Sequence, residues 1–247
     1  MGQQLQLLAM TGLNATMDRI TAATNNLANI NTTGFKAQRP VFQALPVYGQ
    51  GLPDRVDVVA RDDSADFRSG PIEHTGRSLD VAVNGSGWIA VKTADGSSAL
   101  TRNGALSVSA TGILQTNDGH PVLGEGFAPI SLPPLQSVTI GADGTISGAL
   151  VGQSPEQIST LNRIMLVDPP AQSLTRRTDG LFQDQSGKPT PSAKVTLAVG
   201  ALEGSNADSV STMINLIENT RTFQMETELV HTVGASGQGQ GTPLSLN

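Results

Sequence analysis

The sequence predicts a mainly β protein with a long α-helix at each end. The two helices are expected to pair as a coiled-coil-like region, and the central β domain to consist of hairpins. Apolar residues recur at helical spacing near both ends, and short apolar runs separated by turn residues fill the middle. The 27 glycines and 14 prolines among 247 residues are typical of many tight turns. Because only 38% of the residues are hydrophobic and 3% aromatic, we expect a small core.

The first predicted element, within residues 1–35, is a helix that serves as part of an assembly core. Between residues 5 and 30, alternating steps of four and three, if Thr24 is counted, separate Met10, Leu13, Met17, Ile20 and Leu27. A repeat of 3.5 residues is typical of a helix that packs on another helix. Gly34 can adopt the left-handed conformation that closes a last helical turn.

The middle of the chain is predicted to change from an extended connecting region, residues 36–71, to a central β domain, residues 72–202. The first part is polar and holds several prolines. In the second part we expect strands at residues 79–83, 88–92 and 164–167. Positive φ angles for primed hairpin turns are expected at Asp95-Gly96, Asp118-Gly119, Asp143-Gly144 and Asp179-Gly180.

The last predicted helix covers residues 203–233 and has a wide apolar face. That face consists of Val210, Met213, Ile214, Leu216, Ile217, Phe223 and Val230. Ser205 or Asn206 is expected to cap the helix, and Asp208 to favour its first turn. Residues 234–247 are rich in Gly and Gln and are predicted to be a flexible tail.

The two terminal helices are separated by about 170 residues, and each has an apolar face that needs a partner. They can pair with each other, with neighbouring subunits, or with both. The sequence therefore predicts a protein that associates.

Charge and composition exclude several classes of function. The net charge is −6 and the pI is near 5.0, and no cluster of Lys and Arg is visible, so no nucleic-acid partner is expected. The sequence contains no run of about 18 apolar residues, so no membrane insertion is expected. The first ten residues carry no basic region and no small-residue cleavage site after an apolar core, so no cleaved signal peptide is expected. The absence of cysteine excludes disulfides and thiolate metal sites.

No catalytic, cofactor-binding or metal-binding residues are predicted, and no cofactor is expected. His74, His120 and His231 stand in no paired metal-binding spacing. The Gly85-Ser86-Gly87 triplet lacks the first glycine of a nucleophile elbow, because Val83 takes that position. We therefore predict that the chain is not an enzyme.

Three segments of the sequence resemble the axial proteins of the bacterial flagellum, the family of rod and hook subunits. The first comprises residues 23–29, ATNNLAN, and residues 33–36, TGFK. The second comprises residues 79–88, LDVAVNGSGW, and then 101–104, TRNG, 112–114, GIL, and 119–124, GHPVLG. The third is residues 202–206, LEGSN, followed by Met213, Ile217, Arg221 and Phe223. The resemblance thus extends from the first predicted helix to the last.

The resemblance implies a structural subunit of the basal-body rod, which polymerises through its terminal helices into a torque-transmitting drive shaft. The residues of the central and carboxy-terminal motifs are most similar to those of proximal-rod subunits. The distal-rod type is the alternative, but its usual Trp and Lys are missing from the start of this chain. The family's partners would be other rod subunits, further copies of the chain and the flagellar type III export apparatus. Export without a cleaved signal to the periplasmic rod is also implied.

The resemblance and the apolar patterns together predict an assembly interface on the two helices and the segment that follows the first. Leu27, Phe35 and Phe223 are expected to be apolar anchors, and the asparagines either to fix register or to cap a helix end. The predicted interface residues are Leu13, Met17, Ile20, Asn25, Asn26, Leu27, Asn29, Gly34, Phe35, Val210, Met213, Ile217, Arg221 and Phe223.

Two readings from other classes remain open. In the first, the chain is a secreted binding module in which Trp88, next to glycines, offers a stacking platform for a sugar, although an apolar run favours a buried Trp88. In the second, it is a hydrolase of peptidoglycan, a reading for which the sequence supplies no catalytic constellation.

Overall fold

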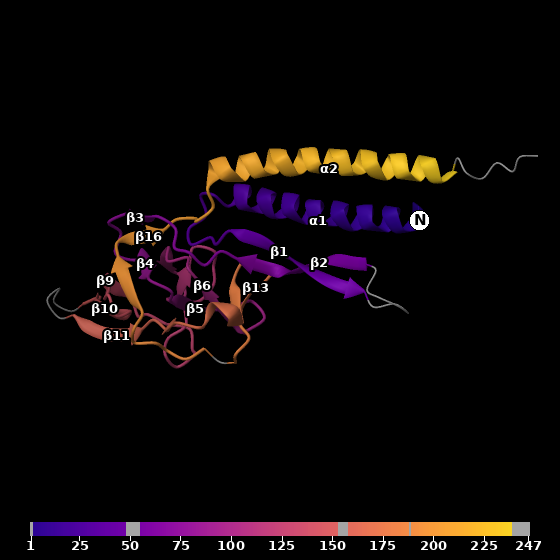
Figure 1. Ribbon diagram of the computed structural model, residues 1–247. Coiled ribbons are helices and arrows are strands. Elements are labelled where there is room, and N and C mark those ends of the chain that lie inside the picture. Colours follow the sequence, from indigo (N-terminus) through magenta and orange to yellow (C-terminus); the bar gives the residue numbers. More distant parts are fainter. Residues whose placement is uncertain (1, 48–54, 153–157, 188, 239–247) are drawn as a thin grey trace, which may run out of the picture. The chain divides into compact units, whose positions relative to one another are not determined.

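The computed structural model describes residues 2–47, 55–152, 158–187 and 189–238 (Figure 1). The chain divides into two compact units. The helical unit comprises residues 1–28, 38–64 and 208–247, and the β unit comprises residues 29–37 and 65–207. Each unit is therefore assembled from segments that are distant in the sequence.

The helical unit contains the two predicted terminal helices, and they lie side by side (Figure 1). Its elements are α1 (Gly2–Ala28), β1 (Gln38–Val47), β2 (Arg55–Ala65) and α2 (Ser209–Gln238). β1 and β2 form a two-stranded sheet, and β1 also contacts α1. The prediction of paired terminal helices around a central β domain is confirmed.

The end of α1 differs from the sequence-based expectation. The helix ends at Ala28, whereas Gly34 lies in a later turn in which the Phe35 N–H donates to the Thr32 carbonyl. Gly34 has a φ of 70°, so the left-handed conformation is present, but it serves this turn and not the last turn of the helix.

Asp208 is the N-cap of α2, in place of the expected Ser205 or Asn206. Its Oδ2 accepts a hydrogen bond of 2.9 Å from the Ser211 N–H and a second from the Ser211 hydroxyl. These bonds satisfy a donor that the first turn of the helix leaves unpaired. The helix continues to Gln238, beyond the predicted boundary at residue 233, and the rest of the predicted tail, residues 239–247, lies outside the described residues.

The cap predicts a pH dependence of α2. Hydrogen bonds from the Ser211 side chain and main chain hold the pKa of the Asp208 carboxyl below its ordinary value. Because the folded pKa is lowered, this stabilisation is present above the unfolded value of about 4 and is lost as the pH falls through the folded value. Asp208→Asn keeps a good cap without a titrating group. In circular dichroism from about pH 5 downward, we expect the unchanged protein to lose more helix than this variant. Equal losses would contradict the assignment.

The β unit consists of short antiparallel strands, as predicted. They are β3 (Ile72–His74), β4 (Val81–Asn84), β5 (Trp88–Lys92), β6 (Ser98–Thr101), β7 (Leu106–Val108), β8 (Leu114–Thr116), β9 (Leu135–Ile140), β10 (Thr145–Leu150), β11 (Ser159–Arg163), β12 (Leu166–Val167), β13 (Leu174–Arg176), β14 (Phe182–Asp184), β15 (Thr196–Val199) and β16 (Ala201–Glu203). The largest sheet has the order β12-β5-β6-β14-β13, and another has the order β11-β10-β9. β15 pairs with β4, and β16 with β3.

β5 lies between two buried clusters of apolar side chains. Ile89 and Val91 belong to the larger cluster, while Trp88 and Ala90 belong to the smaller one with Phe182. Because successive side chains of a strand point to opposite faces, a strand buried on both faces needs a continuous apolar run. This explains the unbroken run from Trp88 to Val91.

The Asp-Gly pairs lie in tight turns, but the turns are not of the primed type. Gly96, Gly119, Gly144 and Gly180 have φ angles between 82° and 85°, whereas none of the preceding aspartates has a positive φ. In the first turn, the Gly96 N–H donates to the Thr93 carbonyl and the Thr93 N–H to the Ser97 carbonyl. One left-handed glycine after an ordinary turn is the three-residue hairpin loop with a glycine bulge.

Candidate functional site

Three buried charged side chains form hydrogen bonds and ion pairs with one another inside the β unit. The carboxylate of Glu203 accepts a hydrogen bond of 2.7 Å from the Lys36 ammonium on Oε1 and one of 2.9 Å from the Arg102 guanidinium on Oε2. All three side chains are at most 1% exposed. We call this set the buried ion cluster. It joins the TGFK, TRNG and LEGSN motifs, which are far apart in the sequence.

The buried ion cluster has two positive charges and one negative charge. Burial lowers the pKa of the Lys36 ammonium, while its hydrogen bond to Glu203 and the charge of that carboxylate oppose the change. The main chain disperses the remaining positive charge, since Lys36 also donates to the Arg68 carbonyl and Arg102 donates to the carbonyls of Val83 and Gly85. Every one of these bonds is charge-assisted, which makes the cluster a strong internal tie.

Hydrogen bonds around the buried ion cluster hold three segments of the β unit together. The Asn206 Oδ1 accepts from the Ala37 N–H at 2.7 Å, and its Nδ2 donates to the carbonyls of Asp66 and Arg68. The Gly34 N–H donates to the Glu203 carbonyl at 2.7 Å. The chain passes between the two units close to these residues, at 37/38, 64/65 and 207/208. The β unit therefore ties down the segments that connect with β1, β2 and α2.

Aromatic rings cover the buried ion cluster. The Trp88 ring lies 4.8 Å from that of Phe182, and the Arg102 guanidinium lies 5.2 Å from the centre of the Trp88 ring. Trp88 is 2% exposed, so the prediction that it is buried is confirmed. A buried ring cannot serve as a stacking platform for a sugar, which removes the main support for the binding-module reading.

The seam between the two helices is lined mainly by small and polar side chains. From residue 9 of α1 onward, the buried residues are Ala15, Thr16, Ala22 and Ala23. On α2, buried or half-buried positions recur at steps of four and three, at Thr212, Leu216, Asn219, Phe223, Glu226 and Val230, and Ser209 and Thr222 beside this row are also half-buried. A side chain at Gly12 would meet the Glu226 carboxylate at 3.4 Å. Steps of four and three are those of a coiled-coil seam, which confirms the predicted mode of pairing.

Several large apolar side chains of the helices lie outside this seam. Val210, Met213, Ile214 and Ile217 on α2 are between 50% and 64% exposed, and Met17 on α1 is 52% exposed. At 100° per residue, the four α2 residues lie opposite the seam-facing positions. We call these four the outer apolar face of α2. Contiguous exposed apolar side chains are a common feature of protein–protein contact surfaces.

The predicted interface residues fall into four structural groups. Met17, Asn25, Val210, Met213, Ile217 and Arg221 are exposed on the helices, and Leu13, Ile20, Leu27 and Phe223 are half-buried. Asn26 holds β1 against α1, because its Nδ2 donates to the Gln38 carbonyl and its Oδ1 accepts from the Gln38 N–H. Asn29, Gly34 and Phe35 belong to the β unit, where the Arg176 guanidinium lies 5.1 Å from the Phe35 ring.

Sequence reasoning did not assign a role to Lys36, Arg102 or Glu203, and it considered Asn206 only as a helix cap, although each lies inside a motif that the family resemblance singled out. One signal was available, because the three short motifs contain two cations and one carboxylate. Only their spatial convergence distinguishes buried charges from solvated ones.

The described residues offer no constellation for metal chemistry. Within them, no group of three or more His, Asp or Glu side chains is arranged to hold a metal ion. No helix in this part of the chain is both long and apolar enough to cross a membrane. The organised features are an internally tied β unit and a helix pair with an exposed apolar face. Together these features are typical of a structural subunit.

The comparisons with known proteins agree with this class. Residues 7–36 match the family model "Flagella basal body rod protein", residues 82–148 match "Flagellar hook protein FlgE/F/G D1 domain", and residues 198–235 match "Flagellar basal body rod FlgEFG protein C-terminal". The flagellar basal-body rod protein FlgF of Escherichia coli K12 is 39% identical, with 97% of each chain covered. FlgF of Salmonella typhimurium is 37% identical over 91% of this chain and 92% of its own. FlgG of Buchnera aphidicola subsp. Schizaphis graminum is 31% identical over 91% and 94%.

The chain belongs to the FlgE/F/G family of flagellar proteins and is a structural subunit of the basal-body rod of the FlgF type. This membership confirms the predicted family and the prediction of a non-enzymatic protein. It also implies assembly with other rod subunits.

Proposed function

We propose that the chain is a proximal-rod subunit that polymerises through its terminal helices and forms part of the torque-transmitting drive shaft. The observation that carries this proposal is the outer apolar face of α2, exposed on a helix that is already paired along its other side. Full burial of one such side chain contributes about 1.5–3 kcal/mol. Burial of this face against another chain would therefore contribute substantially to the free energy of association.

The composition of the seam supports the same proposal. The fully buried seam residues are mainly Ala and Thr, and the larger apolar side chains such as Leu216 and Phe223 are only half-buried, so the pair of helices buries a limited apolar area by itself. Neighbouring rod subunits would supply the missing burial. Of the predicted interface residues, those exposed on the helices are positioned for such contacts, whereas Asn26, Gly34 and Phe35 would act indirectly by holding the chain segments next to the helices.

The buried ion cluster supports a role in transmitting load. In the subunits of a drive shaft, force on the helices must reach the β unit without unfolding the chain segments that connect the two units. The three tied segments meet this need, because breaking them would expose buried charges that are strongly unfavourable without partners. The neighbours in this proposal are proximal-rod and distal-rod subunits and other copies of the chain.

We also propose export through the flagellar type III apparatus, without a cleaved signal, to the periplasmic rod. A chain without cysteine cannot form a disulfide during passage. The modest stability of the helix pair is compatible with folding that is completed only on assembly.

Substitution of Ile217 tests polymerisation through the helices. Ile217→Glu places a charge on the outer apolar face of α2, and because Glu forms helices as well as Ile does, a loss of helix propensity would not explain the result. We expect this variant to be exported but absent from purified hook–basal bodies by mass spectrometry, with swimming motility abolished. Ile217→Met, which keeps an apolar side chain, should be incorporated normally. Normal incorporation of Ile217→Glu would refute the proposed interface.

A further inference from the structure

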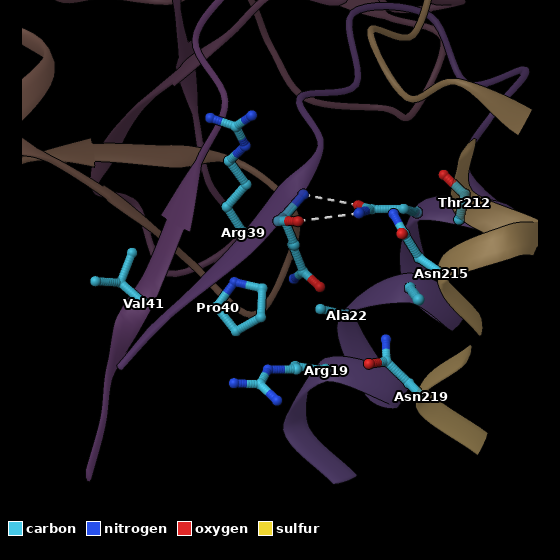
Figure 2. A pocket seen from close by; sticks show the side chains of 11 residues that line it. Arg19, Ala22, Arg39, Pro40, Val41, Thr212, Asn215 and Asn219 are labelled. Atoms are coloured by element: carbon cyan, nitrogen blue, oxygen red, sulfur yellow. Dashed lines mark hydrogen bonds between the residues drawn. The ribbon is translucent and has the colours of Figure 1, made fainter. Parts of the chain in front are cut away.

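A pocket of about 480 Å³ lies within the helical unit, between α1, β1 and the first turns of α2 (Figure 2). β1 contributes one wall with Pro40 and Val41, and α2 contributes another with Asn215 and Asn219. Ala22 and Ala23 of α1 line it as well. Its volume is within the range of sites that bind small molecules or short peptide segments.

The walls of the pocket are held in position by a two-way hydrogen bond. The Asn26 side chain donates to the Gln38 carbonyl at 2.9 Å and accepts from the Gln38 N–H at 2.7 Å (Figure 2). A carboxamide that pairs with both main-chain groups of one residue fixes the start of β1 against α1. The pocket is therefore formed before any ligand arrives.

The charge of the pocket is positive. Arg19 lines it, and no Asp or Glu is among its lining residues. The Arg19 guanidinium lies 4.6 Å from the centre of the Phe42 ring, which orients it. Among the described residues, no carboxylate pairs with Arg19. An anionic group is thus the complementary ligand.

The carboxamides of the pocket favour a peptide over a small anion. Asn215 and Asn219 are one helical turn apart on α2, and within the described part of the chain neither side chain has a hydrogen-bond partner. Each carboxamide can both donate and accept, which matches the N–H and C=O groups of a peptide main chain. A fully ionised phosphate offers acceptors for the carboxamide N–H groups but, unlike a peptide main chain, no donor for the carboxamide oxygens.

We propose that this pocket binds a short acidic segment of a neighbouring rod subunit, with a carboxylate on Arg19 and the segment's main chain on Asn215 and Asn219. This inference rests on the proposed function and names the chemistry of one contact in the assembly. Like-charged subunits need such a contact, because copies with a net charge of −6 repel each other unless local basic sites receive acidic segments.

Photo-crosslinking in assembled hook–basal bodies tests the proposal. Val41 lines the pocket and is 44% exposed, so Val41→p-benzoylphenylalanine places a photoreactive group at its mouth without removing a polar contact. Mass spectrometry of the cross-linked peptides then identifies the occupant. We expect a segment of an adjacent axial protein that contains Asp or Glu.

The Arg19→Gln variant provides a second test in the same cross-linking experiment, because it removes the positive charge of the guanidinium and keeps much of the side-chain stem. We expect the cross-link yield to fall about tenfold, the effect of losing one charge-assisted hydrogen bond. Lys194→Gln is the matched control, since it removes one exposed positive charge from the β unit. Its yield should equal that of the unchanged chain.

The outcomes separate this inference from the proposed function. If the unchanged chain is absent from basal bodies, the proposed function fails and the inference fails with it. If the chain is incorporated but the cross-link falls on a segment without carboxylates, on a lipid or on nothing, only the pocket proposal is overturned. A yield that is insensitive to Arg19→Gln would overturn it too.

Discussion

Replacing Glu203 with glutamine is expected to destabilise the β unit by about 3–5 kcal/mol. The substitution keeps the shape of the side chain but removes the carboxylate that pairs with both the Lys36 ammonium and the Arg102 guanidinium, which are almost fully buried. Water cannot solvate these groups in place, so the whole desolvation cost appears in the free energy of unfolding. The protein has a single tryptophan, Trp88, which is buried over this cluster, and urea unfolding followed by its fluorescence measures the change.

The matched control is Glu125→Gln. Glu125 also pairs with an arginine, Arg163 at 3.3 Å, but both side chains are substantially exposed. An exposed ion pair contributes about 0–1 kcal/mol, so the unfolding midpoint should hardly move. If the two variants lost similar stability, the buried ion cluster would not be the tie that its geometry indicates.

Replacing Gly34 with alanine is expected to cost about 2–4 kcal/mol, from two sources that add. Gly34 has a φ of 70°, which side chains rarely adopt, and a Cβ there would lie 2.3 Å from the carbonyl carbon of Arg102. Relief of the overlap requires the TGFK segment to move away from Arg102, which would stretch the bond from the Gly34 N–H to the Glu203 carbonyl. Thermal unfolding of the purified chain measures the loss.

Gly76→Ala isolates the conformational part of this cost. Gly76 has nearly the same φ, 73°, but a Cβ at this position would meet no atom within 4 Å. We expect it to lose about 1–2 kcal/mol, the cost of a left-handed conformation alone. Equal losses for the two alanine variants would show that the close approach of Gly34 to Arg102 is unimportant.

The periodic parts of the fold were predictable from local chemistry. The step pattern of apolar residues predicted helices at both ends, and the continuous apolar run from Trp88 to Val91 predicted a strand, because burial imposes different spacings on the two structures. The Asp-Gly pairs predicted turns for the same kind of local reason. The turn type was wrong, since the number of residues between paired strands is set by their pairing and not by the dipeptide.

The helix boundaries and caps depended on contacts that lie elsewhere in the chain. Asn206 has the chemistry of an N-cap, but its carboxamide is engaged with Ala37, Asp66 and Arg68, which leaves Asp208 to cap α2. Likewise Gly34 was expected to close α1, yet its position is set by Arg102 and Glu203. In both cases a tertiary partner outweighed a local preference.

The sequence by itself determined the order of the elements and the motifs that identify the family, since both are carried by residues close together in the chain. Only the tertiary structure decided which large apolar side chains remain outside the helix seam. It also decided that Lys36, Arg102 and Glu203 meet, and that Arg19 lines a pocket beside β1. Burial and charge pairing depend on distances between segments that the order of residues does not specify. The residues next to a lysine in the sequence do not show whether its side chain is solvated or buried.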